Sequence, residues 1–255
     1  MALLLVAPPF GLRAESGGTA HGEHAKSNWV KQVTAENVGV GKLVPLPTGG
    51  WLGVGSAPSG RSSGDVDGWI MCLDESGDIT WQRGIGGPFD DMFVDVAPTV
   101  DSGWLLAGLT WSFGVHGTVC YGWLCKLDSQ LGVSWQRRFR DTSIQGLQFV
   151  TSILAAEDGT SIALITSGSC RSNAFTLASL GPAGAVRWSK SYAFSKSIAN
   201  LAYDSIRLGD GTIVIGGTTQ ELTSSQTSLR RWVATPENGG AMRIDDPSAS
   251  RTINL

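Results

Sequence analysis

Tryptophan recurs along this chain at a nearly constant interval. Trp29, Trp81, Trp135 and Trp188 are separated by 52, 54 and 53 residues. An interval of about fifty residues is typical of a repeat in which each unit forms one four-stranded sheet. The 255 residues of the chain therefore predict a series of similar structural units.

Three further columns of residues keep the same interval. Two of them mark the starts of apolar runs: Gly50-Trp51, Gly103-Trp104, Gly159-Thr160 and Gly211-Thr212 in one, and Gly68-Trp69 and Gly122-Trp123 in the other. In the third column, Asp74, Asp128, Gly181 and Thr235 lie seven residues before Trp81, Trp135, Trp188 and Met242. Met242 is therefore the fifth member of the tryptophan series.

Each unit contains four strand-like segments. In the second unit they are Phe93–Ala97, Trp104–Leu109, Gly122–Leu127 and Val133–Arg137. The second segment is apolar on both faces, so both faces must be covered, whereas the fourth is half polar and suits an outer edge. This gradient predicts an all-β fold, a β-propeller of about four blades, each blade a four-stranded antiparallel sheet.

The repeats set the expected domain boundaries. Residues 28–246 form the predicted propeller domain, residues 1–27 a leader or weak signal segment with a flexible linker, and residues 247–255 a C-terminal tail. The strand Trp29–Val33 is expected to pair into the last blade as a closing clasp, displacing or joining residues 241–244. If the ring is incomplete, two copies would complete it as a homo-oligomer.

The turn before each repeat tryptophan predicts a tight hairpin. A glycine three or four residues earlier, such as Gly77 or Gly132, would supply the positive φ that such a turn requires. The tryptophan that follows is then expected to pack its ring between neighbouring blades.

One segment also carries a family resemblance. Gly122-Trp-Leu-Cys-Lys-Leu-Asp-Ser-Gln-Leu-Gly-Val-Ser-Trp135 resembles bacterial extracellular β-propeller repeats and is similar to the quinoprotein-type tryptophan-docking motif. The resemblance covers Trp29 to about Met242 and implies a propeller fold in an exported protein. The chain has no vicinal cysteine pair and no quinone-binding set, so no cofactor is expected.

Composition narrows the partners and the location. Charged residues make up 16% and the formal net charge is −3, so there is no general nucleic-acid footprint. No segment has the roughly twenty apolar residues of a transmembrane helix. The short apolar stretch within Met1–Ala14 favours a secreted or periplasmic protein, although it lacks a positive leading region. The basic run Arg137–Arg140 is interpreted as protection of a strand edge against aggregation.

The four cysteines are too few for a disulfide-rich scaffold. Cys72 and Cys125 lie in apolar strands and are predicted to be buried thiols. Cys120 and Cys170 fall in corresponding loops of neighbouring units. The sequence leaves open whether these two form a disulfide.

Candidate site residues lie in the variable loops between second and third strands, or at crossings between units. Trp111 fits no repeat column and lies near His116, so it would either stack on a ligand or plug the channel. Asp65 and Asp67 faintly resemble a calcium loop but lack its other ligands, so no metal is expected. The adjacent carboxylates Asp90 and Asp91 point to opposite sides of a strand, which favours a role in a turn.

These features favour a non-catalytic binding or assembly scaffold, with a protein or carbohydrate partner held by the blade loops. No catalytic residue is assigned. The alternative is a propeller hydrolase, glycosidase- or lactonase-like, that uses the loop carboxylates Asp65, Asp67, Asp90 and Asp91. That alternative requires the four carboxyl groups to converge on one channel mouth.

Overall fold

A computed structural model describes residues 2–6, 30–34, 37–60, 65–113, 119–140, 147–167, 174–193, 197–223, 226–236 and 242–245. These residues form strands and turns and contain no helix. No helix among them could therefore cross a membrane. The predicted all-β fold is confirmed.

Sixteen strands form four antiparallel sheets, each a simple meander of four consecutive strands. The first sheet contains β3 (Gly39–Pro45), β4 (Trp51–Pro58), β5 (Val66–Leu73) and β6 (Ile79–Ile85). The second contains β7 (Asp91–Pro98), β8 (Trp104–Thr110), β9 (Tyr121–Leu127) and β10 (Val133–Phe139). The third contains β11 (Gln148–Ala155), β12 (Ser161–Ser167), β13 (Ala174–Leu180) and β14 (Val186–Ala193). The fourth contains β15 (Ser197–Arg207), β16 (Ile213–Thr223), β17 (Gln226–Pro236) and β18 (Met242–Asp245).

A separate two-stranded sheet pairs β1 (Ala2–Val6) with β2 (Val30–Thr34). The predicted clasp is therefore wrong, because β2 pairs with β1, and β18 completes the fourth sheet. β18 begins at Met242, the residue that continues the tryptophan series. β1 is apolar and lies much closer to β2 along the chain than the fourth sheet does, so it is the nearer pairing partner.

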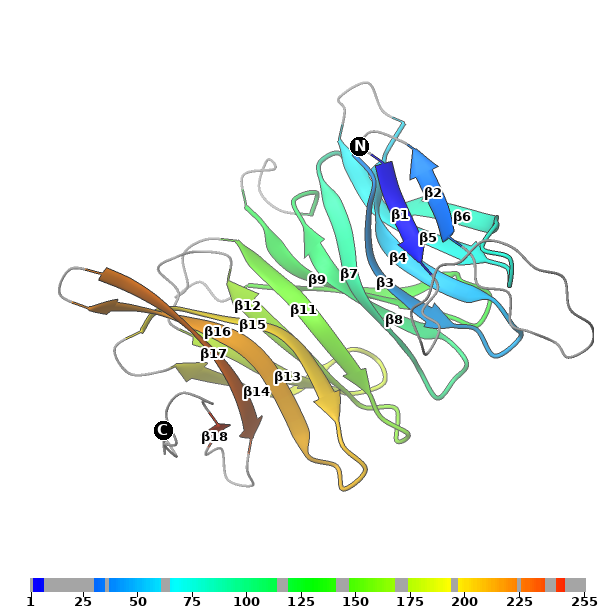
Figure 1. Ribbon diagram of the computed structural model, residues 1–255. Helices are drawn as coiled ribbons and strands as arrows, with labels where there is room; N and C mark the ends of the chain where they lie inside the picture. The colour runs from blue at the N-terminus through cyan, green and yellow to red at the C-terminus, as the bar shows by residue number, and fades with distance from the viewer. Residues whose placement is uncertain are drawn as a thin grey trace, which may run out of the picture.

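The sheets lie in a row in chain order, with the first and fourth at opposite ends (Figure 1). The first strand of each later sheet packs on the sheet before it: β7 contacts β3, β4 and β5, β11 contacts β7, β8 and β9, and β15 contacts β11, β12 and β13. This arrangement fits a β-propeller-like fold. Its repeated junctions place the apolar core between successive sheets.

Burial follows the predicted gradient across a sheet. Every residue of β8 is buried, whereas the outermost strands β6 and β10 are mostly exposed. A strand pressed between two sheets must be apolar on both faces, and an outermost strand need not be. The polarity of the four segments therefore gave the correct order of strands within each sheet.

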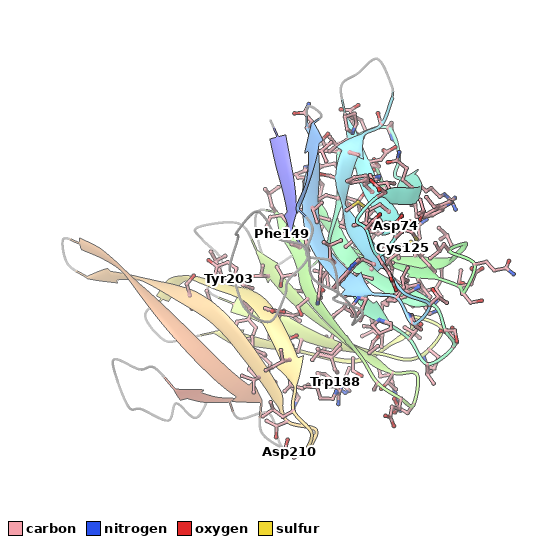
Figure 2. The ribbon with its side chains drawn as sticks, turned by 45° about the vertical axis from the view of Figure 1, so that its right-hand side comes forward. Asp74, Cys125, Phe149, Trp188, Tyr203 and Asp210 are labelled. Carbon is pink, nitrogen blue, oxygen red and sulfur yellow. The ribbon has the colours of Figure 1, made fainter. Side chains whose placement is uncertain are left out.

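The repeat tryptophans on the outermost strands are less buried than predicted. Trp81 is 37% exposed and Trp188 is 43% exposed, and Trp188 lies near the lower surface of the molecule (Figure 2). Trp135 is half-buried, and its Nε1–H donates to the carbonyl oxygen of Pro182 in the next sheet at 3.2 Å. The expectation that Trp81 and Trp188 fill the seams is wrong, because an outermost strand has only the edge of the next sheet beside it.

Other tryptophans fill the core instead. Trp69, Trp104 and Trp123, at the starts of apolar runs, are 5%, 7% and 0% exposed. Trp123 stacks on Phe93 with ring centroids 4.4 Å apart. Trp29 lies outside the described residues.

In the first three sheets, the hairpin between the third and fourth strands turns through one residue with positive φ. Gly77 and Gly184 take this conformation as predicted, with φ of 82° and 76°. In the second sheet, however, Leu131 takes it with φ of 63°, and Gly132 does not. The prediction for Gly132 is wrong because the positive φ falls on the third residue after Asp128, which is Leu131. The carbonyl oxygen of Asp128 accepts from Leu131 N at 3.1 Å and closes the turn there.

Candidate functional site

The structure brings most of the predicted site residues to one edge of the first two sheets. Asp65 and Asp67 lie at the start of β5, Asp90 and Asp91 at the start of β7, and Trp111 directly after β8. These strand ends meet because β6 crosses to β7 through the loop 86–90. His116 lies outside the described residues.

Asp91 is the buried centre of this edge. Its side chain is fully buried, and its carboxylate accepts from Ser112 Oγ at 2.6 Å, from Gly87 N at 2.8 Å and from the Thr110 hydroxyl. Burial raises the pKa of Asp91 above its usual value, although these hydrogen bonds oppose the shift. With this set of donors, Asp91 ties the loop 86–90 to the end of β8.

Ser112 is a second hub that the sequence did not reveal. Its hydroxyl contacts Asp91, accepts from Phe89 N at 3.0 Å, and lies 3.0 Å from the Phe89 carbonyl oxygen. Its own backbone N donates to Thr110 Oγ1 at 3.1 Å. A serine in a polar loop has no distinguishing pattern, so only the strand pairing could have identified this role.

The other carboxylates surround the same loop. Asp90 is exposed, and its Oδ1 accepts from Val66 N at 3.0 Å. Asp67 is half-buried and lies over Gly86, where a methyl group would be 2.3 Å from Asp67 Oδ1 and 2.6 Å from Asp91 Oδ2. The predicted opposite orientation of Asp90 and Asp91 is confirmed, since one is exposed and the other buried.

Asp65 and Trp111 act through their backbones. The Asp65 carbonyl oxygen accepts from Ser59 N at 2.9 Å, and Trp111 N donates to the Asp90 carbonyl oxygen at 3.0 Å. Both side chains are half-buried. Within the described part of the chain, no group of three histidine, cysteine, aspartate or glutamate residues is placed to hold a metal ion.

A groove of about 680 Å³ opens next to this edge, along the outer side of the second sheet. It is lined by Phe113, Trp123, Gln136, Arg137 and Arg138. Phe113 is 36% exposed, and its ring lies 5.8 Å from that of the buried Trp123. The groove therefore combines an accessible aromatic ring with the guanidinium group of Arg138, which lies on the same face of the sheet as Trp123.

The arginines of this region lie on the outermost strand β10 and the residue after it. Arg138 and Arg140 lie over the Tyr121 ring, at 5.0 Å and 5.7 Å from its centroid. Among the described residues, no carboxylate forms an ion pair with Arg137, Arg138 or Arg140. The edge position predicted for this run is confirmed, because β10 is the last strand of its sheet.

Part of this groove belongs to the repeat. Trp123 Nε1–H donates to Gln136 Oε1 at 2.9 Å, and in the first sheet Trp69 Nε1–H donates to Gln82 Oε1 at 3.1 Å. After the shared glutamine, the first sheet continues Arg83-Gly84 and the second Arg137-Arg138. The second guanidinium and Phe113 distinguish the second sheet.

Two cysteines are buried and unreactive. Cys120 and Cys125 are free thiols, and burial raises the pKa of each to about 12. Cys120 Sγ–H donates to the Gln148 carbonyl oxygen at 3.5 Å, so this thiol is not in a disulfide. Cys170 lies outside the described residues.

No protein family and no curated protein matches the sequence. Among solved structures, the fold is similar to an endo-1,4-beta-xylanase from Bacteroides thetaiotaomicron, with a TM-score of 0.46 and 9% identity. The similarity covers 80% of this chain and 74% of that chain. A similarity of this size carries no functional argument.

Proposed function

We propose that this chain is a non-catalytic binding module that takes an acidic oligosaccharide in the groove between Phe113 and Arg138. The supporting observation is Arg138, which lines the groove beside the exposed ring of Phe113 and has no carboxylate partner among the described residues. Guanidinium groups bind carboxylates with paired hydrogen bonds, and an aromatic ring packs on the apolar face of a sugar. The groove offers both.

The carboxylates beside the groove support a structural role for that edge. Asp91 is buried and accepts three hydrogen bonds, and Asp90 accepts from Val66 N. A carboxylate held in this way positions a loop and is closed to substrate. In this proposal the loop 86–90 supports the segment that carries Phe113, since Gly87 lies beside Ser112 and Phe113.

The test is a calorimetric titration with oligogalacturonate, with a neutral xylo-oligosaccharide and a glutamate-rich peptide as comparison ligands. Oligogalacturonate should bind best, and the affinity should fall as salt rises. The variant R137Q/R138Q should lose about tenfold or more in affinity. The matched control is R83Q, which removes the corresponding arginine of the first sheet and should leave binding unchanged.

Two results would contradict this proposal. One is equal binding of oligogalacturonate by the wild type and R137Q/R138Q. The other is stronger binding of the glutamate-rich peptide, which would identify an acidic protein as the partner instead.

A hydrolase is the second candidate. It is favoured by the meeting of the Asp67 and Asp91 carboxyl groups over Gly86 and by the burial that raises the pKa of Asp91, since a pair of carboxyl groups in different surroundings can perform acid–base catalysis. Turnover of a glycoside or lactone, abolished in D67N while the fold is retained, would establish it. Without such turnover, the pair is a structural one.

We further propose that the protein is bacterial and exported. The apolar start of the chain and its similarity to extracellular propeller repeats support this. N-terminal sequencing of the protein recovered outside the cytoplasm should find that the leader, residues 1–27, has been removed. An intact start on cytoplasmic material would contradict export.

A further inference from the structure

Each of the first three sheets has one face that the next sheet in the chain covers, which we call its forward face. In the first sheet, Leu52, Val54 and Ile70 pack in one cluster with Phe93 and Trp104 of the second sheet. The other two junctions are built in the same way: Leu105 and Ala107 with Val150 and Ile153, and Ile162 and Leu164 with Ala202 and Ile215.

The fourth sheet has the same kind of face, but nothing described covers it. Tyr203, Ile206 and Leu208 are 52%, 53% and 44% exposed. Ile206 occupies the same position in the fourth sheet as three residues of the earlier sheets that pack into the junctions: Val44, Ala97 and Leu154. Tyr203 lies on the fourth sheet, far from Asp74 of the first (Figure 2). Three large apolar side chains in one patch of a terminal sheet indicate an interaction surface.

One position in the first strand of each sheet carries a polar side chain, and the residues at this position in the first and fourth sheets have opposite charges. Each first strand has a register shift, and the residue after it is Lys42, Asp95, Ser152 or Asp204. These residues join neighbouring sheets: Lys42 Nζ donates to Asp95 Oδ1 at 2.5 Å, and Ser152 Oγ donates to Asp204 Oδ1 at 3.1 Å. The series begins with a cation, 43% exposed, and ends with an exposed anion.

From these matches we infer that the forward face of the fourth sheet binds the first sheet of a second copy of this chain, head to tail. The receiving face would be Val40, Leu43, Trp51, Trp69, Met71 and Leu73. In the second sheet, the matching residues Phe93, Val96, Trp104, Trp123, Cys125 and Leu127 pack on the first sheet. Asp204 of one copy then meets Lys42 of the other.

Head-to-tail contacts either form a closed ring or grow into a filament. Two copies joined twice would form a ring of eight sheets, which is within the range of known propellers. In the single chain, Trp69, Met71 and Leu73 are already buried, and the β1–β2 sheet lies beside the first sheet (Figure 1). The receiving face must therefore become accessible before a second copy can bind, so association should be slow.

The test is sedimentation equilibrium of the full chain over a range of concentrations. The wild type should form a dimer, and I206D should weaken its association by about tenfold or more, because a buried charge disrupts an apolar interface. L208D is a second variant on the same face. The matched control is V186D, since Val186 is 51% exposed on β14 of the third sheet and belongs to neither of the two faces that are proposed to meet.

Carbodiimide crosslinking and mass spectrometry identify the partner face, using mixed copies with and without a nitrogen-15 label. An interchain link between Asp204 and Lys42 is expected. A wild type that stays monomeric at all concentrations, a dimer that I206D and L208D leave intact, or links that join only two fourth sheets would each overturn the proposal.

Discussion

Ser102 takes a backbone conformation that the repeat otherwise gives to glycine. Its φ is 60°, and the corresponding turns have Gly49, Gly159 and Gly211 with φ of 93°, 78° and 86°. A left-handed conformation costs a side-chain-bearing residue about 1–2 kcal/mol. S102G should therefore raise the free energy of unfolding by about 0.5–1 kcal/mol, after the entropy that glycine adds to the unfolded chain. Urea unfolding measures this.

Ser129 provides the control for this substitution. It is exposed in the β9–β10 turn and does not have a positive φ. S129G should lower the free energy of unfolding by about 0.5 kcal/mol. A loss of stability in both variants would show that Ser102 is not strained.

The carboxyl group of Asp101 makes the free energy of unfolding depend on pH in the acidic range. The Lys126 ammonium donates to both of its oxygens, at 2.9 Å and 2.8 Å, and with Thr99 lowers the pKa of Asp101 from 3.8 to about 2. A lowered folded-state pKa adds stability that is present above pH 3.8 and is lost as the pH falls toward 2. The difference in unfolding free energy between wild type and D101N should therefore shrink across that window, as measured by urea titrations at stepped pH.

Lys126 provides the control for that pH dependence. Its ammonium group is the largest cause of the shift at Asp101. K126M should remove most of the acid-dependent difference between Asp and Asn at position 101. If the difference persists in K126M, the ion pair is not its source.

Among the structural elements, the outermost strands show how a tryptophan can hold two sheets together from an edge. Trp135 on β10 lies against Gly184 of the next hairpin and borders a cavity of about 190 Å³ between the second and third sheets. W135A should cost about 2 kcal/mol, less than the 3–5 kcal/mol expected for the buried Trp123 in W123A. W188A should cost least, because Trp188 is 43% exposed. Thermal and urea unfolding of the three variants give this order.

A different order would locate the main contribution elsewhere. If W188A were the most damaging of the three, the exposed tryptophan would have a buried partner that the described residues do not include. W135F separates packing from hydrogen bonding, because it keeps a ring but loses the bond to Pro182.

The strands were predictable because their burial is extreme. Trp104–Leu109 is apolar at nearly every position, and β8 covers Trp104–Thr110. The depth of each tryptophan was not predictable, since it depends on which neighbouring sheet lies beside the strand. The positive φ of Leu131 was missed because the turn requires it at a fixed position, three residues after the carbonyl oxygen that closes the turn, and that position does not need to hold a glycine.

The candidate site was predictable only in part. The loops and the position of Asp91 followed from the repeat, but the approach of Asp67 in the first sheet to Asp91 in the second, on either side of Gly86, depends on how the two sheets pack. The groove depends on Phe113 after one strand and Arg138 on another. Such pairs arise from sheet packing, which spacing along the chain does not encode.

At the scale of the whole molecule, one buried carboxylate joins three sheets. Asp95 is 3% exposed and accepts from Lys42 Nζ in the first sheet at 2.5 Å and from Ile153 N in the third at 2.8 Å. D95A would leave the buried Ile153 N–H without its acceptor and should cost about 3 kcal/mol. Urea unfolding should also become less cooperative, with a lower m value, if the sheets separate.

The comparison variant is K42M. The Lys42 side chain is 43% exposed, so its removal leaves Asp95 with the donors Val96 N and Ile153 N. It should cost less than D95A and keep one cooperative transition. Equal losses in the two variants would assign the whole effect to the ion pair.

The register shift that recurs in the first strand of every sheet has a consequence for how such a chain changes in length. Each junction between sheets has the same register shift, a polar side-chain contact at the residue after that shift, and apolar residues at the same positions. Duplicating one whole unit of about fifty residues would add a sheet whose contacts on both sides are already encoded. Duplicating a fraction of a unit would leave a seam unfilled, so gene rearrangements that survive should preserve whole units.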